Sequence, residues 1–205
     1  MISWTTFVFF VSASLALVLI PGPNHLYIMA RGLSQGRAAA LVSAVGVEVA
    51  TLVHIAAAAA GLSYVIARSA TLFAIVKWAG VAYLVYLGIR AFTGGDGAAA
   101  RTPERQPLRK VFLEGVVVNL LNPKVTLYFL AFLPQFVRPE AGSPAAQIVV
   151  LGLTLLALGT LSDIVYAFAA GALSDRLTSR ARALRRLSGV VYLGLGVATA
   201  FTGRK

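Results

Sequence analysis

Cysteine, histidine and charged residues are scarce in this sequence. Of its 205 residues, none is cysteine, two are histidine and only 12% are charged. The absence of cysteine excludes a disulfide framework, thiol–disulfide chemistry and metal sites with thiolate ligands. Soluble domains carry about a quarter charged residues and less than half apolar ones, whereas this chain is 59% hydrophobic. A soluble protein of this size could not keep so much apolar surface from water, so the composition predicts a membrane protein.

The scarcity of histidine also limits catalysis inside a membrane. A zinc protease of the membrane needs a His-Glu-x-x-His helix, and the sequence contains no such motif. A serine protease of the membrane needs a nucleophile paired with a base. The two histidines, His25 and His54, have no obvious serine partner in the sequence. We therefore predict that the chain is not an enzyme and holds no metal.

Acidic residues are fewer than basic ones, and the formal net charge is +11. Such an excess can indicate nucleic-acid binding. Here, however, the basic residues lie in short loops between apolar runs rather than on one exposed helical face, so membrane topology explains them better. We expect no nucleic-acid partner.

Long apolar runs recur along the chain. About 20 mostly apolar residues are needed to cross roughly 30 Å of hydrocarbon. The predicted fold is therefore all-α: one polytopic membrane domain with about six transmembrane helices. The first run is an uncleaved span, because Met1–Trp4 carries no positive charge and no convincing cleavage site follows. The second and third runs are closely linked, which leaves a five-span alternative. The six predicted spans are residues 5–30, 39–67, 70–92, 109–136, 145–172 and 186–203.

The distribution of basic residues predicts the orientation. Positive charges concentrate on the cytoplasmic side of membrane proteins. The richer side holds Arg31, Arg37, Arg90, Arg101, Arg105, Arg109, Lys110, Arg176, Arg180, Arg182, Arg185 and Arg186. The other side holds Arg68, Lys77, Arg138, Arg204 and Lys205. The richer side is predicted to face the cytoplasm, which places both termini outside it.

The chain shows signs of an internal repeat. A polar connector, residues 93–109, separates a first half (1–92) from a second half (110–205), and its composition predicts mobility. The sequence GVAYL at residues 80–84 returns as GVVYL at 189–193. Three spans in each half would place the second copy upside down, and such inverted repeats are typical of transporters.

Prolines interrupt two predicted spans at corresponding places. Pro21-Gly22-Pro23 lies in the first span, and Asn122-Pro123 lies in the fourth. We expect each helix to stop and restart, with Gly22 and Asn122 at the caps. Each restart would aim N–H groups and a positive dipole end into the bundle, which suits a substrate carboxylate. The alternative is that both are packing kinks.

Ionisable residues lie within the spans, where each costs on the order of 2.5–3.5 kcal/mol. Glu48 and Asp163 are predicted at similar depth, roughly 14 Å from the cytoplasmic edge at 1.5 Å per residue. Lys124 lies beside the second break. Glu48 and Asp163 could bind a substrate ammonium or carry a coupling proton, and His54 could join a proton path. The alternatives are a structural ion pair with Lys124 and a histidine that is hydrogen-bonded to a neighbouring helix.

Two features lie near the predicted cytoplasmic surface. Leu173–Leu187 places leucines at helical spacing with arginines between them. This segment could lie on anionic lipid, extend the last helix or form a short basic loop. Glu114 lies near enough to this interface to reach water, so we assign it no role.

Five groups of residues, in order along almost the whole chain, form one recognisable pattern. They are Pro21-Gly22-Pro23, then Val53-His54-Ile55 with Gly61-Leu62, residues 77–84 (KWAGVAYL) with Tyr86-Leu87-Gly88, Asn119 with Asn122-Pro123-Lys124, and Leu133-Pro134-Gln135-Phe136. Individually the groups are short, but together they are specific. The chain resembles the LysE/RhtB amino-acid exporter family.

The resemblance implies a bacterial inner-membrane exporter of amino acids or close derivatives, driven by the proton motive force and without a cofactor. Family substrates include lysine, arginine, threonine, homoserine, leucine and cysteine-related compounds. Protons, membrane lipids and further copies of the chain are the other expected partners. The expected substrate-binding residues are Pro21, Gly22, Pro23, Asn24, Asn119, Asn122, Pro123 and Lys124.

The sequence departs from the family at one place. Relatives often have Gly-Asp before the Val-His pair, whereas this chain has Ala50-Thr51, and its acid, Glu48, lies three positions before Thr51. A role transferred from that aspartate to Glu48 is therefore in doubt. A channel or a structural membrane subunit is the alternative to an exporter.

Overall fold

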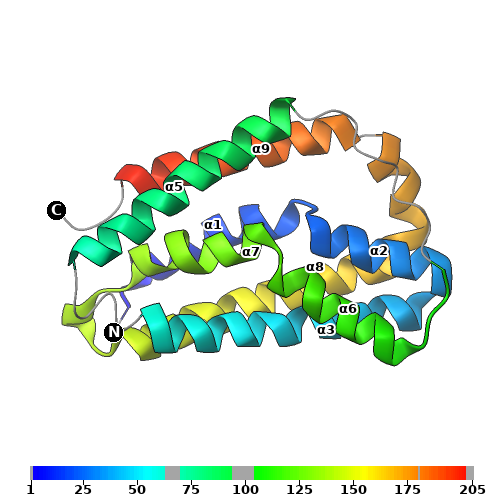
Figure 1. The fold of residues 1–205 in the computed structure, drawn as a ribbon, viewed down its shortest axis with the longest axis horizontal. Helices are drawn as coiled ribbons and strands as arrows, with labels where there is room; N and C mark the ends of the chain where they lie inside the picture. The colour runs from blue at the N-terminus through cyan, green and yellow to red at the C-terminus, as the bar shows by residue number, and fades with distance from the viewer. Residues whose placement is uncertain (1, 63–69, 94–103, 180, 202–205) are drawn as a thin grey trace.

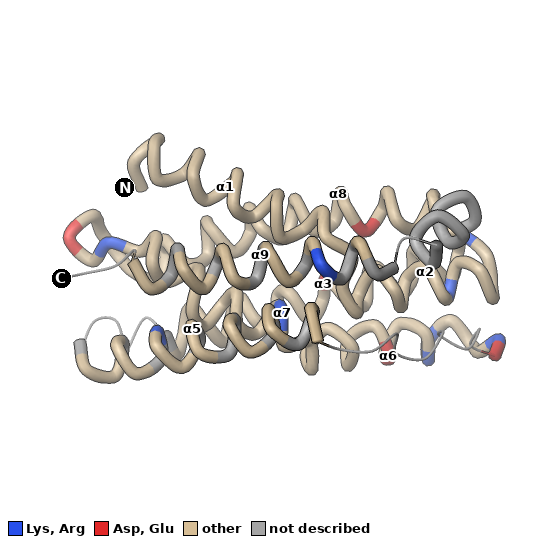
Figure 2. Tube along the Cα trace, turned by 90° about the horizontal axis from the view of Figure 1, so that it is seen from above, with Lys and Arg blue, Asp and Glu red and all other residues tan. Residues whose placement is uncertain are grey.

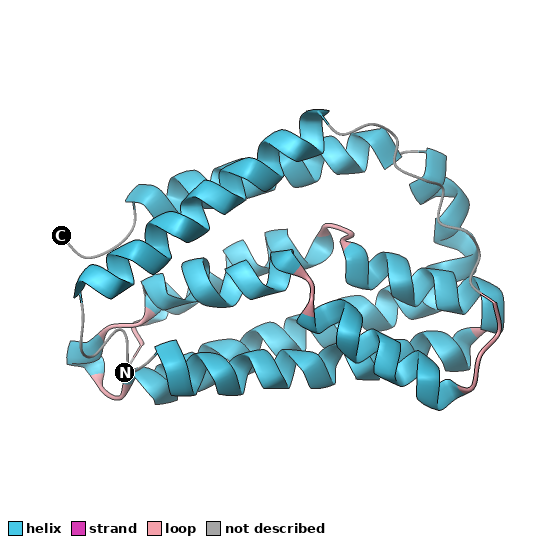
Figure 3. Ribbon diagram, in the orientation of Figure 1, coloured by secondary structure: helices cyan, strands magenta, loops and turns pink. Residues whose placement is uncertain are grey.

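The structure is a computed structural model of residues 1–205, and it describes residues 2–62, 70–93, 104–179 and 181–201. Throughout these ranges the regular structure is helical, joined by short loops (Figure 3). The helices are α1 (Trp4–Leu19), α2 (Pro23–Gln35), α3 (Arg37–Ala57), α5 (Ala70–Thr93), α6 (Leu108–Leu120), α7 (Pro123–Leu127), α8 (Pro144–Ser179) and α9 (Ala181–Phe201). π-Helical turns η1 (Ala58–Leu62) and η2 (Tyr128–Phe132) continue α3 and α7, and 3₁₀ turns η3 (Leu133–Phe136) and η4 (Pro139–Ala141) precede α8.

Several of these helices are long and apolar enough to cross a membrane. Among the described residues, Arg37–Gly61 and Pro144–Ala170 do so as single helices. Two further spans form if each bent pair counts as one: α1 with α2, and α6 with the helix that continues to Phe136, each bent by 45°. α5 and α9, of 24 and 21 residues, are the other two segments that the sequence predicts as spans. The protein is thus an all-α polytopic membrane protein, as predicted.

The observed boundaries differ from the predicted ones at the ends that are predicted to face the cytoplasm. α8 continues to Ser179 and α9 begins at Ala181, whereas the predicted spans end at 172 and begin at 186. The described parts of the charged segment between them, up to Ser179 and from Ala181, are helical, and their leucines repeat at helical spacing. Its contact with lipid stays a prediction, because the side chains of residues 171–182 lie outside the described part.

The helices form a main bundle and an attached pair. α5 and α9 pack against each other in antiparallel fashion, and they meet the rest of the molecule largely through η2 (Figure 1). In the main bundle, α3 packs against α6, α8 and α2, while α8 also packs against α1 and α2. The view in Figure 2 separates the end of the molecule where α1 begins and α9 ends, which we call the terminal end, from the opposite end, where α6 lies.

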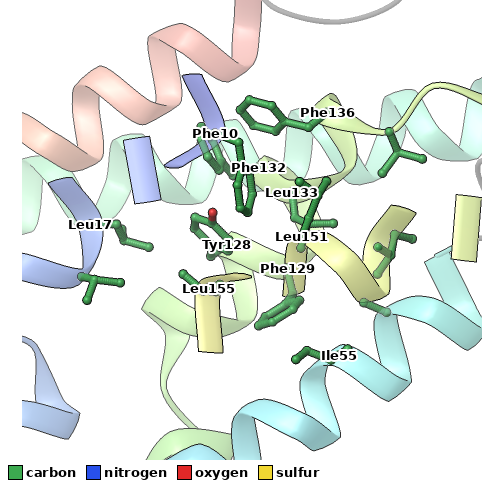
Figure 4. Packing of buried hydrophobic residues seen from close by; sticks show 14 residues of the cluster. Phe10, Leu17, Ile55, Tyr128, Phe129, Phe132, Leu133, Phe136, Leu151 and Leu155 are labelled. Carbon is green, nitrogen blue, oxygen red and sulfur yellow. The ribbon is translucent and has the colours of Figure 1, made fainter. Parts of the chain in front are cut away.

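Two groups of buried side chains fill the main bundle on either side of the helix breaks. Towards the termini, Phe10, Tyr128, Phe132 and Phe136 pack ring against ring, with centroid separations of 5.0–6.1 Å (Figure 4). We call this group the aromatic cluster. Towards the opposite end the packing uses smaller side chains: Ile28, Ala40, Ala44, Val47 and Ala167. Between these two groups, in the middle of the bundle, α1 ends and α2 begins, and α6 ends and α7 begins.

Close contact between α3 and α6 depends on glycine. A β-carbon on Gly115 would lie 2.7 Å from the carbonyl oxygen of Ser43, and one on Gly46 would overlap the carbonyl oxygen of Phe112. Small residues let helix backbones approach in membranes, where van der Waals packing drives helix association. This contact joins α3, which also packs against α2 of the first bent pair, to α6 of the second bent pair.

We expect Gly115→Ala to destabilise the protein, because the added methyl group forces α3 and α6 apart. Overpacking of this kind costs about 1–3 kcal/mol, which should lower the unfolding temperature in detergent by several degrees. Gly194→Ala is the matched control, since a β-carbon there meets nothing within 4 Å. Equal unfolding temperatures for both variants would contradict the close contact.

Candidate functional site

The first break lies between α1 and α2. α1 ends at Leu19, and α2 begins at Pro23 with Gly22 as its N-cap residue. Proline has no N–H group, and its φ angle suits the first helical position, so it starts a helix without losing a hydrogen bond. The helix therefore stops and restarts where the sequence predicts.

Side chains from other helices satisfy the carbonyl groups that this break exposes. The carbonyl oxygens of residues 18, 19 and 20 accept hydrogen bonds from Ser162 Oγ at 3.3 Å, Tyr166 Oη at 3.1 Å and Lys124 Nζ at 2.8 Å, respectively. Unpaired backbone groups cost several kcal/mol each in hydrocarbon. The end of α1 is thus held by α8 and α7, and the position of the break depends on all three helices.

The second break lies between α6 and α7. α7 begins at Pro123, and Asn122 is its N-cap residue. Asn122 Oδ1 accepts a hydrogen bond from the backbone N–H of Lys124 at 3.0 Å. This is the arrangement that the sequence predicts, and it places the Lys124 side chain next to the first break.

Three buried asparagines join the two breaks. Asn24 Nδ2 donates to Asn119 Oδ1 at 2.9 Å, and Asn122 Nδ2 donates to Asn24 Oδ1 at 2.8 Å. Asn119 Nδ2 also donates to Thr51 Oγ1 at 2.9 Å and to the Val47 carbonyl at 2.6 Å. Each amide finds its partners on other helices, so the three side chains fix α2, α3 and the second broken span relative to one another.

A small cavity of about 60 Å³ lies where the two breaks meet. One water molecule needs roughly 10–15 Å³ of such space, so the cavity has room for a few. Its polar lining consists of Asn24, His25, Glu48, Thr51, Asn122, Lys124 and Asp163. Its apolar lining consists of Leu17, Val18, Val47, Val125, Tyr128 and Leu155, with Gly22 and Gly159 between. Four of the predicted substrate-binding residues therefore line it. Pro21, Pro23 and Pro123 shape the backbone around it, and Asn119 holds the lining residue Asn24 by a hydrogen bond.

Two carboxyl groups in this cavity keep free hydrogen-bonding capacity. Asp163 is 3% exposed, and among the described residues neither Glu48 Oε2 nor Asp163 Oδ2, both buried, has a hydrogen-bond partner. The two groups, from α3 and α8, lie near enough to interact with each other. Glu48 approaches α8 at Gly159, where a β-carbon would lie 2.8 Å from Oε1. Buried acceptors without donors are rare in proteins, so these two oxygens can accept further hydrogen bonds from a group that enters the cavity.

Lys124 does not complete an ion pair with either acid. Among the described residues, no carboxylate oxygen lies within 4.0 Å of Lys124 Nζ. The ammonium group instead donates to the Ile20 carbonyl and lies over Gly22, where a β-carbon would be 3.5 Å from Nζ. The cavity thus presents one cation at the breaks and two acids on the facing helices.

His25 belongs to this site, although the sequence pattern assigns it no transport role. Its Nδ1 accepts the Gly22 N–H at 3.2 Å, so a neutral ring carries its proton on Nε2. Nε2 lies 3.2 Å from Ser162 Oγ and 3.4 Å from Asp163 Oδ1. Its place in the sequence could have indicated this contact, because His25 is the third residue of the restarted helix and a side chain there can reach back to the N-cap N–H.

His54 lies outside the cavity. Its Nε2 is 3.3 Å from the Asn119 carbonyl oxygen, and its ring stacks on Phe129 with centroids 5.6 Å apart. This is the simpler of the two arrangements that the sequence allows, a histidine hydrogen-bonded to a neighbouring helix.

Comparison with known proteins agrees with this architecture. The family model described as LysE type translocator matches residues 15–203. A membrane protein of Vibrio cholerae is 30% identical over 189 residues, covering 89% of this chain and 90% of its own length. A homoserine/homoserine lactone efflux protein of Salmonella typhimurium is 29% identical over 194 residues, covering 91% and 92%. A leucine efflux protein of Klebsiella pneumoniae is 26% identical over 192 residues, covering 90% and 89%.

No solved structure matches the chain. The family model spans nearly the whole sequence, including both helix breaks and every residue of the polar cavity lining. The chain belongs to the LysE type translocator family of membrane proteins.

Proposed function

We propose that this protein is a secondary exporter that carries a small amino acid or a close derivative out of the cytoplasm in exchange for protons. The observation that carries this proposal is the buried cavity between two helix breaks, with Lys124 on one side and two partly unpartnered carboxyl groups on the other. The names of the Salmonella and Klebsiella relatives, which refer to efflux of homoserine and of leucine, support an amino acid as the solute.

The cavity suits the two charged ends of an α-amino acid. A substrate ammonium group has three N–H donors. It could supply the hydrogen bonds that Glu48 Oε2 and Asp163 Oδ2 do not receive from other described residues. The substrate carboxylate would meet Lys124 and the N-terminus of α2, where Gly22 has no side chain to cap the N–H groups of Asn24 and His25. The apolar walls, chiefly Leu17, Val18, Val47 and Leu155, would accept an uncharged side chain.

Exchange follows from competition at the two acids. With Lys124 as the one cation among the described residues that line this low-dielectric site, the two neighbouring carboxyl groups do not both stay charged without a second positive charge. Either a proton or a substrate ammonium group can supply it, but the two together are unnecessary. A site that binds one or the other, and changes the side of the membrane to which it is open only when it holds one of them, performs antiport.

An inverted repeat would provide the movement. In this proposal α1–α2, α3 and α5 correspond to α6–α7, α8 and α9, respectively. Equal bends of 45° in the two broken spans support it, as do the contacts of α3 with α8 and of α5 with α9, which would pair equivalent helices. Both termini would lie outside the cytoplasm. In this proposal the aromatic cluster would close the cavity towards the outside, and the small side chains of α2, α3 and α8 would close it towards the cytoplasm.

A resistance screen tests the class of solute. Cells that overproduce the protein should survive toxic amino acids and analogues that the protein expels, and efflux of each compound should saturate and depend on the proton gradient. A channel would give flux without saturation, and a structural subunit would give none. Either result would contradict the proposal.

We expect Asp163→Asn to abolish proton-driven efflux from proteoliposomes while the protein stays folded. The amide keeps the shape of the side chain but can neither carry the coupling proton nor attract an ammonium group as strongly. Glu140→Gln is the control, because Glu140 is an exposed acid in η4 that does not line the cavity. Full transport by the Asp163 variant would remove Asp163 from the mechanism.

Protons should act as competitive inhibitors of substrate binding. When exchange is measured with equal pH on both sides, a lower pH should raise the KM for the amino acid and leave the maximal rate nearly unchanged. The physical reason is that a proton on the acid pair occupies the place of the substrate ammonium group. A pH-dependent maximal rate at constant KM would show that protons act elsewhere.

Lys124→Gln should lose selectivity for the substrate carboxylate. Glutamine can still donate to the Ile20 carbonyl, so the break keeps its hydrogen bond while the charge is removed. The wild-type protein should bind an amino acid more tightly than its methyl ester, and the variant should bind both about equally, measured as inhibition of exchange. Unchanged discrimination in the variant would place the carboxylate away from Lys124.

A further inference from the structure

A buried arginine ties the two proposed halves together near the predicted cytoplasmic end. Arg31, on α2, is only 2% exposed. Its guanidinium group forms a salt bridge to Glu114 on α6 at 2.5 Å and donates to the Glu104 carbonyl at 2.9 Å and to Gln35 Oε1 at 3.0 Å. Such a planar fork of donors suits several acceptors at once.

The chain just before α6 lies against α2 as a strap of residues 104–107. Gln35 Nε2 donates to the Gln106 carbonyl at 2.7 Å, and Gln106 N donates to Gln35 Oε1 at 3.1 Å. Arg105 Nε donates to the Ser34 carbonyl at 3.3 Å. The predicted mobile connector is therefore held in place at this end, while residues 94–103 lie outside the described part.

A second contact between α2 and α6 lies one turn closer to the cavity. Tyr27 Oη donates to the Val111 carbonyl at 2.7 Å and to Glu114 Oε2 at 3.2 Å, and Arg31 lies over the Tyr27 ring at 5.5 Å. Glu114, which the sequence assigns no role, accepts from both Tyr27 and Arg31 and is the centre of these contacts.

We propose that these residues form an inner latch, defined by Arg31 and Gln35 on α2 and by Gln106 and Glu114 on the strap and α6, which must open before solute can reach the cavity from the cytoplasm. α2 starts at the cavity, where Asn24 and His25 are part of the lining, and ends at the latch. A latched α2 cannot move away from α6 without breaking these bonds. The proposal rests on the transport function proposed above.

Water can reach one side of the latch even when it is closed, because Glu114 is partly exposed. The Glu114 side chain is 33% exposed, whereas that of Arg31 is 3% exposed. Arg31 Nε is buried and has no hydrogen-bond partner in the described structure, so the closed latch leaves one donor unsatisfied. Separation of α2 from α6 would let water reach all five N–H groups of the guanidinium, which offsets part of the bonds lost.

A reversible cross-link tests whether the latch opens during transport. The chain has no cysteine, so Gln35→Cys/Gln106→Cys introduces the only two thiols. A short bifunctional methanethiosulfonate should join them, and mass spectrometry would verify the link. We expect amino-acid efflux from proteoliposomes to stop on cross-linking and to return after reduction, while each single-cysteine variant treated in the same way keeps its efflux. Full efflux by the cross-linked protein would overturn the latch. Absence of efflux in the untreated wild-type protein would instead overturn the proposed function.

Labelling gives a second test that does not depend on transport. Met29 is 5% exposed and lies on α2 between the cavity and the latch. In a Met29→Cys background, Glu114→Gln should speed the reaction of the thiol with a membrane-impermeant reagent several-fold in inside-out vesicles, because the weaker latch opens more often. Glu140→Gln should leave that rate unchanged. Equal rates for all three proteins would show that Glu114 does not keep the cytoplasmic side closed.

Discussion

The structure depends on hydrogen bonds to the backbone carbonyl groups at the end of α1. A membrane offers no water to pair with them, so a broken helix is tolerated only where protein groups take that part. Ser162, Tyr166 and Lys124 supply the donors. These three side chains come from both α8 and α7, and they bring Asp163 and the Lys124 ammonium group beside the break. The solution to a backbone problem therefore also assembles the polar cavity.

The described lining of the cavity has two carboxyl groups, Glu48 and Asp163, but only one lysine, Lys124. Lys124 donates to a carbonyl group, His25 accepts the Gly22 N–H, and two carboxyl oxygens receive no hydrogen bond from the other described residues. In the proposed mechanism a proton or a substrate ammonium group would occupy this place, and competition between the two would produce exchange.

The sequence predicts the parts of this architecture that depend on single residues. The length of the apolar runs predicts the spans. Pro23 and Pro123 predict where helices begin again, with Gly22 and Asn122 as N-cap residues, because proline affects the helical turn in which it lies. Contacts between helices are another matter. The bonds of Asn24 to Asn119 and Asn122, the place of His25 and the pairing of Arg31 with Glu114 depend on how helices rotate and approach. The direct ion pair of Lys124 with an acid, which was one predicted alternative, is replaced by a bond to Ile20 for the same reason.

Proton release on substrate binding tests the exchange at the acid pair most directly. The purified protein in weakly buffered detergent solution would be mixed with an amino acid whose efflux the resistance screen detects, at a pH where the acid pair holds a proton, and a pH indicator would record the change. If the ammonium group displaces a proton from Glu48 and Asp163, the solution becomes more acidic in proportion to the substrate bound, and this change disappears in Asp163→Asn. Binding of substrate to the wild-type protein without any proton release would contradict competition at this site.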